Sequence, residues 1–210
     1  MGTTPNYSWP YPESSDYVAD GATAIENLAD AVDTTVGDID DKMGLILVGF
    51  YQLPGQVSSL TLTNVFSADY DSYLVIFNCD SANASHRNVY MQMGSTISGY
   101  LSSYTFAFFS GSMASDGSIS PGTLLNTGFF LGTVRQSRGA NFHATVHRPY
   151  RNTRTAGHCS YIYQYPNQYG GTGNTGYMLE NTTSYTDLTI LPDAGTVGAG
   201  SVRVYGYRYS

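Results

Sequence analysis

The chain has 210 residues, of which 41% are hydrophobic and 12% are charged, and its formal net charge at pH 7 is −7. This hydrophobic content is sufficient for a folded core, so the composition excludes a globally disordered chain. No run of eighteen apolar residues occurs, and the first residues lack the basic and apolar regions of a secretory signal. We therefore expect neither a membrane span nor a signal peptide.

Residues 1–17 combine three prolines with four aromatic side chains. The prolines favour an extended backbone, and exposed aromatic side chains are common anchors at protein interfaces. We expect this segment to be an extended leader that binds another surface, the alternative being a mobile chain terminus. The expected anchoring residues are Tyr7, Trp9, Tyr11 and Tyr17.

Residues 18–44 have the pattern of a coiled-coil helix. Apolar or small residues recur at alternating steps of four and three, which is the spacing of a seam shared between helices. The β-branched residues at every d position favour a trimer over a dimer. The alternative is a single helix packed on its own β domain. The seam consists of Val18, Ala22, Ile25, Ala29, Val32, Val36, Ile39 and Met43.

Most of the negative charge lies in the leader and the helix. Residues 1–44 contain nine acidic side chains against a single lysine. An acidic helix repels phosphate groups, so we expect no nucleic-acid partner.

From Leu45 onward the apolar residues change to a period of two, which indicates β-strands. About ten strands separated by turns predict an antiparallel β-sandwich, jelly-roll-like, that forms a head domain over residues 45–210. The chain is therefore expected to be mainly β. The expected strands are 45–51, 59–63, 73–79, 89–93, 105–109, 127–132, 141–146, 160–165, 186–191 and 201–207.

Three segments resemble parts of small structural proteins of tailed bacteriophages. Residues 6–33, which include DYVADGATAIENLAD, are similar to a leader and helix that precede a β domain in those proteins. Residues 64–73 and 184–208 are similar to a segment before a central strand and to the closing strands, whereas roughly 95–180 is unmatched. The resemblance implies a homotrimer whose N-terminus binds the particle and whose β domain faces outward. It does not separate a tail fibre from a head fibre.

The sequence contains no arrangement typical of catalysis or metal binding. The seven carboxylates after residue 44 lack the pairing expected for polysaccharide hydrolysis, and no Gly-x-Ser-x-Gly motif is present. Cys79 and Cys159 are far apart and are expected to be buried free thiols. The segment Gly171–Gly176 fits G-x-G-x-x-G but lacks the flanking strand and helix of a nucleotide site, and we interpret it as a flexible loop. We expect no enzyme activity, cofactor or metal.

Aromatic side chains give the best candidates for ligand binding. Tyr161, Tyr163 and Tyr165 alternate on one strand face, and Tyr169 follows, so exposed rings could stack on the sugars of a host surface glycan. Alternatively, these tyrosines pack a contact between subunits. Arg148 and Arg151, in a cluster that also includes Arg154, could meet anionic lipopolysaccharide or a neighbouring acidic helix, or could lie in a solvated loop.

These patterns together predict a virion structural protein, assembled in the cytoplasm of a bacterial host. We expect a short homotrimeric tail fibre that is attached to other virion proteins through its leader and that binds the host surface without catalysis. The alternative is a head fibre or capsid decoration protein that is attached to the capsid or stabilises it.

Overall fold

The computed structural model of the chain describes residues 2–42, 44–83, 86–109, 123–125, 127–136, 138–165 and 168–208. It leaves out the side chains of residues 40–42, 123–125, 165 and 168–169. The contacts divide the chain into two compact units, Met1–Gly44 with Arg208–Ser210, and Leu45–Tyr207. Each unit is described by itself. Among the described residues, no helix combines the length and apolar character needed to cross a bilayer.

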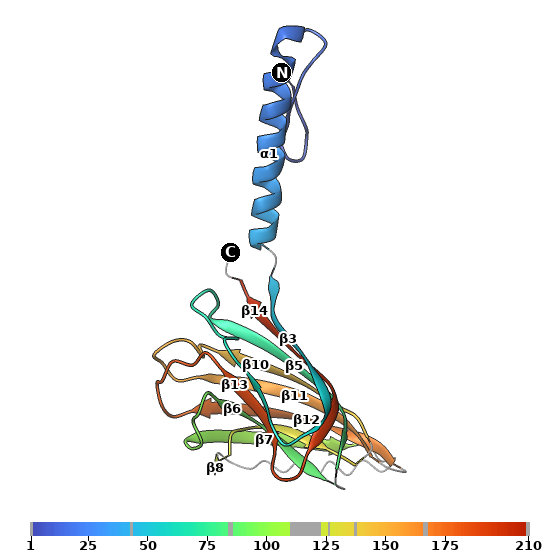
Figure 1. Cartoon of the computed structure of the whole chain (residues 1–210), viewed down its shortest axis with the longest axis vertical. Helices are drawn as coiled ribbons and strands as arrows, with labels where there is room; N and C mark the ends of the chain where they lie inside the picture. The colour runs from blue at the N-terminus through green and yellow to red at the C-terminus, as the bar shows by residue number, and fades with distance from the viewer. Residues whose placement is uncertain are drawn as a thin grey trace. The chain divides into compact units, whose positions relative to one another are not determined.

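The first unit consists of one long helix and a short hairpin. Helix α1 spans Gly21–Lys42 and is preceded by the 3-10 turn η1, Val18–Asp20. The leader forms strands β1, Gly2–Thr3, and β2, Pro10–Tyr11, which pair antiparallel. The leader therefore doubles back beside α1 (Figure 1).

The expectation of a fully extended leader is wrong, because the chain reverses between its prolines. The Ser8 amide donates a hydrogen bond to the Thr4 carbonyl, and the Thr4 amide donates to the Trp9 carbonyl, each at 2.9 Å. Ser8 has a φ of 56°, a left-handed conformation that tight reversals require. The prolines fix the local backbone direction, but a single turn between them is enough to fold the segment back.

The second unit is built from twelve described strands in two antiparallel sheets. The large sheet has the strand order β3-β14-β5-β10-β11-β12-β7-β8, and the small sheet has the order β4-β13-β6-β9. The strands are β3 Leu45–Val57, β4 Leu60–Leu62, β5 Ser72–Ala82, β6 Arg87–Met93, β7 Tyr100–Phe108, β8 Thr123–Leu125, β9 Phe129–Val134, β10 Ala140–His147, β11 Ala156–Tyr165, β12 Gln168–Leu179, β13 Leu188–Pro192 and β14 Val197–Tyr207.

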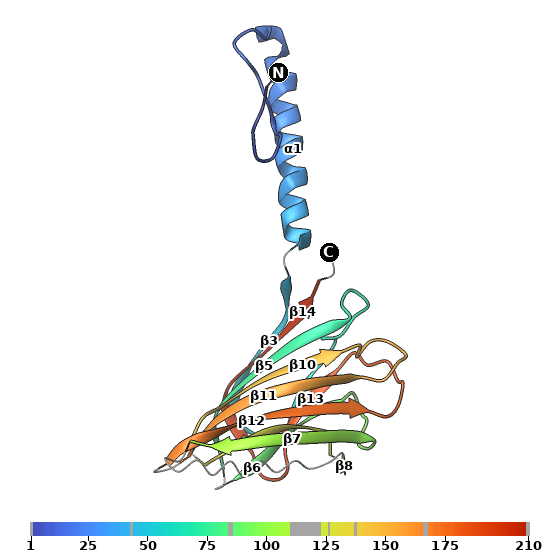
Figure 2. The same ribbon diagram turned by 180° about the vertical axis from the view of Figure 1, so that it is seen from behind.

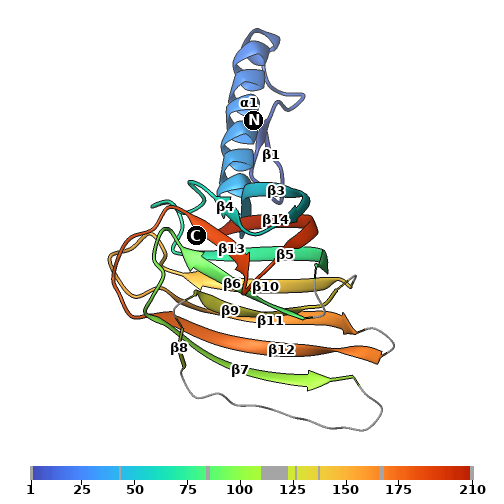
Figure 3. The ribbon, with the colours of Figure 1, turned by 60° about the horizontal axis from the view of Figure 1, so that its bottom comes forward.

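The two sheets are layered, with β9 of the small sheet against β10, β11 and β12 of the large sheet. The prediction of a mainly β domain with antiparallel sheets is confirmed. The detail of a jelly roll differs, because that architecture has eight strands in total whereas the large sheet alone has eight. Figure 3 shows β7 and β12 of the large sheet beyond the strands of the small sheet.

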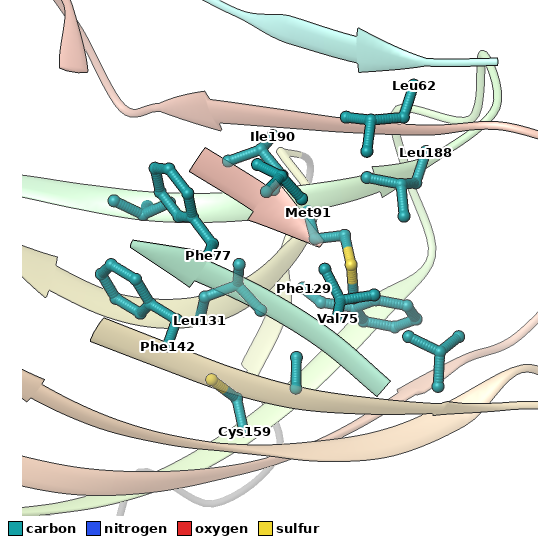
Figure 4. Close-up of a cluster of buried hydrophobic side chains, with 14 of the residues drawn as sticks. Leu62, Val75, Phe77, Met91, Phe129, Leu131, Phe142, Cys159, Leu188 and Ile190 are labelled. Atoms are coloured by element: carbon teal, nitrogen blue, oxygen red, sulfur yellow. The ribbon is translucent and has the colours of Figure 1, made fainter. Parts of the chain in front are cut away.

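The core lies between the facing sides of the sheets and follows the alternation of their strands. In β10, residues alternate between buried and exposed along the strand, as a period-two pattern requires. Phe77 of β5 and Phe142 of β10 stack with their ring centroids 5.4 Å apart (Figure 4). Cys79 and Cys159 point into this core and are free, which confirms the prediction for both. Burial raises the pKa of the Cys159 thiol to about 12.

The β unit contains two strands that the sequence pattern does not predict, β8 and β12. Strand β12 includes the whole segment Gly171–Gly176, so its interpretation as a flexible loop is wrong. A Cβ atom on Gly173 would lie 2.5 Å from the ring of Tyr161, and one on Gly171 would lie 2.8 Å from the hydroxyl of Tyr163. The glycines therefore leave room for two tyrosine rings that lie against the strand.

Candidate functional site

Helix α1 has two adjacent faces of small and apolar residues, and its own leader covers only one of them. Ala24 on the covered face is 3% exposed, and Leu28, Ala31 and Thr35 are half-buried. The indole Nε1 of Trp9 donates a 2.9 Å hydrogen bond to the Thr35 hydroxyl. This bond ties the leader to the helix.

The second face is the predicted seam, and most of it is exposed in the single chain. At 100° per residue, its centre lies about a quarter turn around the helix from the covered face. Val32, at the boundary between the two faces, is half-buried, and Met43 lies outside the described residues. The exposed fractions on the seam are 97% for Val18, 68% for Ile25, 51% for Val36 and 49% for Ile39, and Ala22 and Ala29 are also exposed.

The β unit contains a cleft between its two sheets, with a volume of about 410 Å³. Small-molecule sites commonly measure about 300–1,000 Å³, so its size fits a compact ligand. Its walls come from β7 and β11 of the large sheet and from β6 and β9 of the small sheet, with residues that flank these strands. It is lined by His86, Asn88, Tyr90, Ser102, Tyr104, Phe106, Phe108, Phe130, Thr133, Arg135, Tyr161 and Tyr163.

Aromatic rings form most of the cleft wall and contact one another in series. Tyr104, Phe106 and Phe108 alternate along β7 and are half-buried, so their rings face the cleft. The ring centroids of Tyr104 and Phe130 are 5.1 Å apart, and those of Phe106 and Phe108 are 5.4 Å apart. Such edge-to-face pairs hold the rings in fixed orientations. The cleft therefore offers a preformed aromatic surface to a ligand.

The polar side chains of the cleft come together at one end, at the start of β6 and the end of β9. Asn88 is paired with Thr133 across the two strands, and the Thr133 hydroxyl donates to the Asn88 side-chain oxygen at 3.3 Å. His86 Nε2 lies 3.1 Å from the same oxygen. Arg135 follows β9 directly and adds a guanidinium to this end. Within the described part of the chain, no aspartate or glutamate lines the cleft.

Burial in this region affects the tyrosine hydroxyls. Removal from water raises the pKa of Tyr161 well above its usual value, and the neighbouring Tyr163 raises it further. Burial also raises the pKa of Tyr90. Both hydroxyls therefore remain protonated at neutral pH. They can act as hydrogen-bond donors to a ligand and are not charged nucleophiles.

The structure brings two of the predicted ligand-binding tyrosines into the cleft. Tyr161 and Tyr163 share the inner face of β11 and line the cleft, but each is only 5% exposed. The expectation that their rings are exposed is wrong, because the two sheets enclose that face. Ligand binding by these tyrosines stays a prediction. Tyr165 and Tyr169 lie on β11 and β12, and their side chains are outside the description.

Arg148 and Arg151 lie at the other end of the β10–β11 hairpin from Tyr163. Ala140 is the register partner of Tyr163, and His147 lies seven residues further along β10. This separation corresponds to roughly 23 Å of strand. Arg151 Nε lies 2.5 Å from a side-chain oxygen of Asp71, so this arginine connects two loops. The arginines therefore do not join the tyrosines in one site.

The predicted anchoring aromatics all belong to the helix unit. Tyr7 stacks on Trp9 with the ring centroids 5.1 Å apart. The exposed fractions of Tyr7, Tyr11 and Tyr17 are 56%, 42% and 81%. These three rings are available to another surface, while Trp9 also bonds to the helix. Binding to a particle stays a prediction.

Sequence reasoning missed most of the cleft. The alternation of Tyr104, Phe106 and Phe108 is the same signal that selected Tyr161 and Tyr163, and it could have identified β7 as a second aromatic strand. The polar residues at the end of the cleft carry no comparable pattern. Their proximity arises only from the pairing of β6 with β9.

The outer side of the large sheet, seen in Figure 2, carries the exposed histidines of β10 and β11. His147 Nδ1 lies 2.9 Å from the Ser72 hydroxyl, and His158 Nδ1 lies 2.9 Å from the Thr145 hydroxyl. Within the part of the chain that the structure describes, no group of three or more His, Cys, Asp or Glu side chains is arranged to hold a metal ion.

No family model and no curated protein matches the chain. Among solved structures, sucrose-6-phosphate hydrolase from Lactobacillus gasseri aligns with a TM-score of 0.29 and 11% identity, over 73% of this chain and 28% of the hydrolase. CG-16, a homodimeric agglutinin from chicken liver, aligns with a TM-score of 0.29 and 8% identity, over 70% of this chain and 98% of the agglutinin. Galectin-Ib from Xenopus laevis aligns with a TM-score of 0.20 and 10% identity, over 72% of this chain and 96% of the galectin. At these TM-scores, the alignments carry no functional argument.

Proposed function

We propose that the chain is a homotrimeric, non-enzymatic attachment protein of a bacteriophage virion. Its helices associate through the seam, its leader binds the particle, and its β unit binds the host surface. The observation that carries this proposal is the exposed seam of α1. A chain that covers one apolar face of its helix with its own leader leaves the adjacent face for another molecule.

The seam has the chemistry for association with identical chains. Burying a valine or isoleucine side chain fully contributes about 1.5–3 kcal/mol, and Ile25, Val36 and Ile39 are each about half exposed or more. Heptad spacing with β-branched d residues favours three helices around one axis. Three β units held together would bind a multivalent surface more tightly than one, because the later contacts form at a high effective concentration.

Light scattering coupled to gel filtration tests the assembly. We expect the full chain to have about three times its 22.7 kDa chain mass. The double variant Ile25→Asp/Val32→Asp should have the mass of one chain, because two charges cannot be buried in the seam. The matched control Thr23→Asp/Thr34→Asp adds the same charge at exposed positions off the seam and should stay trimeric. A monomeric unmodified chain would overturn the proposal.

Antibody labelling of intact particles, followed by electron microscopy, tests the attachment site. Labelling at the tail, together with slower adsorption of particles in the presence of excess free protein, is the expected result. Labelling over the capsid would favour the alternative, a head fibre or capsid decoration protein.

A further inference from the structure

The cleft of the β unit has a positive end. Among the described residues that line it, one is formally charged, Arg135. The carboxylate of Asp193 forms an ion pair with Arg87, whose guanidinium nitrogen lies 4.0 Å from an Asp193 side-chain oxygen. A ligand that carries a negative group is therefore complementary to the polar end, whereas a cationic ligand meets no carboxylate among the lining residues that the structure describes.

The aromatic end and the polar end of the cleft are complementary to the ring and the carboxylate of an acidic sugar. A pyranose ring has an apolar face of C–H groups, which packs well on aromatic rings such as Phe106 and Tyr104. A carboxylate on that ring accepts two parallel hydrogen bonds from a guanidinium such as Arg135. The hydroxyls of the sugar can bond to the side chains of Asn88 and Thr133, which already lie beside each other.

We infer that this cleft binds an acidic saccharide of the uronic-acid type, with its ring on the aromatic residues of β7 and its carboxylate on Arg135. Because it names the ligand of the same β unit, this assignment rests on the proposed function. A purely apolar ligand fits less well, because it would remove the Arg135 guanidinium from water without supplying a negative group.

Isothermal titration calorimetry on the full chain tests the assignment, with digalacturonate as the acidic probe and digalactose as the neutral one. We expect digalacturonate to bind at least about ten-fold more tightly than digalactose, which is the usual gain from a charged hydrogen bond. Its affinity should fall as salt is added. Absence of digalacturonate binding, or equal affinity for both probes, would overturn the assignment.

Matched variants locate the site. Phe106→Ala should weaken binding of both probes about ten-fold, whereas Thr105→Ala, on the same strand but facing the other side, should leave binding unchanged. Arg135→Gln should remove the preference for the acidic probe. Arg135→Lys keeps the charge but cannot make the two parallel bonds, so it should keep only part of the preference. Arg203→Gln removes an arginine that lies over Phe50, away from the cleft, and should change nothing. If Arg203→Gln reduces the affinity as much as Arg135→Gln, the binding is not in this cleft.

The same samples separate this assignment from the proposed function. A protein that binds digalacturonate as a monomer supports the cleft and contradicts the trimer. A trimer that binds neither probe contradicts the cleft and leaves the assembly standing. Circular dichroism of each variant before titration shows whether the variant is folded. Affinities are then compared only among folded variants.

Discussion

The helix unit and the β unit differ in how far they bury their large apolar side chains. The β unit encloses its large side chains between two sheets, and Phe129 and Phe142 are fully buried. The helix unit leaves Ile25 and Val36 exposed. The β unit therefore buries its large apolar side chains through contacts within one chain, whereas the helix unit leaves apolar surface that the proposed trimer would bury. Substitutions can test this contrast.

The largest effect is expected in the core of the β unit. Phe129 has no exposed surface and stacks on Tyr177 with the ring centroids 4.3 Å apart. Phe129→Ala should lower the free energy of unfolding by about 3–5 kcal/mol, because it leaves a cavity. Urea denaturation followed by circular dichroism measures this free energy of unfolding. Ile162→Ala, at an exposed position, should change it by no more than about 0.5 kcal/mol. Equal effects at the two positions would contradict the described core.

A smaller effect is expected from filling the space that the glycines of β12 leave for tyrosine rings. Gly173→Ala should lower the free energy of unfolding by about 1–3 kcal/mol, because its Cβ would lie 2.5 Å from Tyr161. Gly176→Ala is the matched control on the opposite face of the same strand, where no atom lies within 4 Å of the added Cβ. It should be neutral or slightly stabilising in the same urea experiment. A neutral Gly173→Ala would mean that Tyr161 does not lie against β12.

The buried tyrosines and thiols predict an alkaline limit for the β unit. Burial raises the pKa of Cys159 to about 12, from an ordinary value of 9.0, and also raises the pKa of Tyr161 and Tyr177. Above pH 9 the folded chain therefore holds more protons than the unfolded chain, so the free energy of unfolding should decrease as pH rises from 9 toward 12. Urea midpoints measured across this range test it. A constant midpoint would contradict the burial of these groups.

The smallest effect is expected at the contact of the leader with α1. Thr35→Val removes the acceptor of the Trp9 indole and should lower the stability of the helix unit by about 0.5–1.5 kcal/mol. Thr34→Val is a close control, since both hydroxyls bond to a carbonyl one turn earlier and only Thr35 also bonds to Trp9. Trp9 is the only tryptophan, so its fluorescence reports this unit alone. Identical emission from both variants would contradict the contact.

Sequence patterns predicted much of the fold because alternation is strong wherever one side of a strand is buried. The mainly β domain and its antiparallel sheets follow from local periodicity, and the free cysteines follow from their wide separation and the lack of a disulfide or metal-binding pattern. Strand β12 could not be found in this way, because its inward positions Gly171 and Gly173 have no side chains to make a pattern. Their role depends on the tyrosines of the neighbouring strand. That information is not local in the sequence.

The candidate site could be predicted only in part for a similar reason. The alternating Tyr161 and Tyr163 marked one wall of the cleft, but periodicity does not say which side of a sheet faces another sheet. The polar end joins His86 and Asn88 to Arg135 across strand pairs that lie more than forty residues apart in the chain. The reversal of the leader depends on one turn at Ser8, whose residue type does not distinguish it from an extended segment.

The folded-back leader also limits how much apolar surface of α1 is exposed. With residues 1–17 cleaved away, Ala24 and Leu28 would meet water beside the seam, and apolar or small residues would occupy a wide arc of the helix. Large exposed apolar patches favour aggregation. The folded-back leader therefore reduces the apolar arc that α1 exposes, and its removal by limited proteolysis should make the helix unit more prone to aggregate.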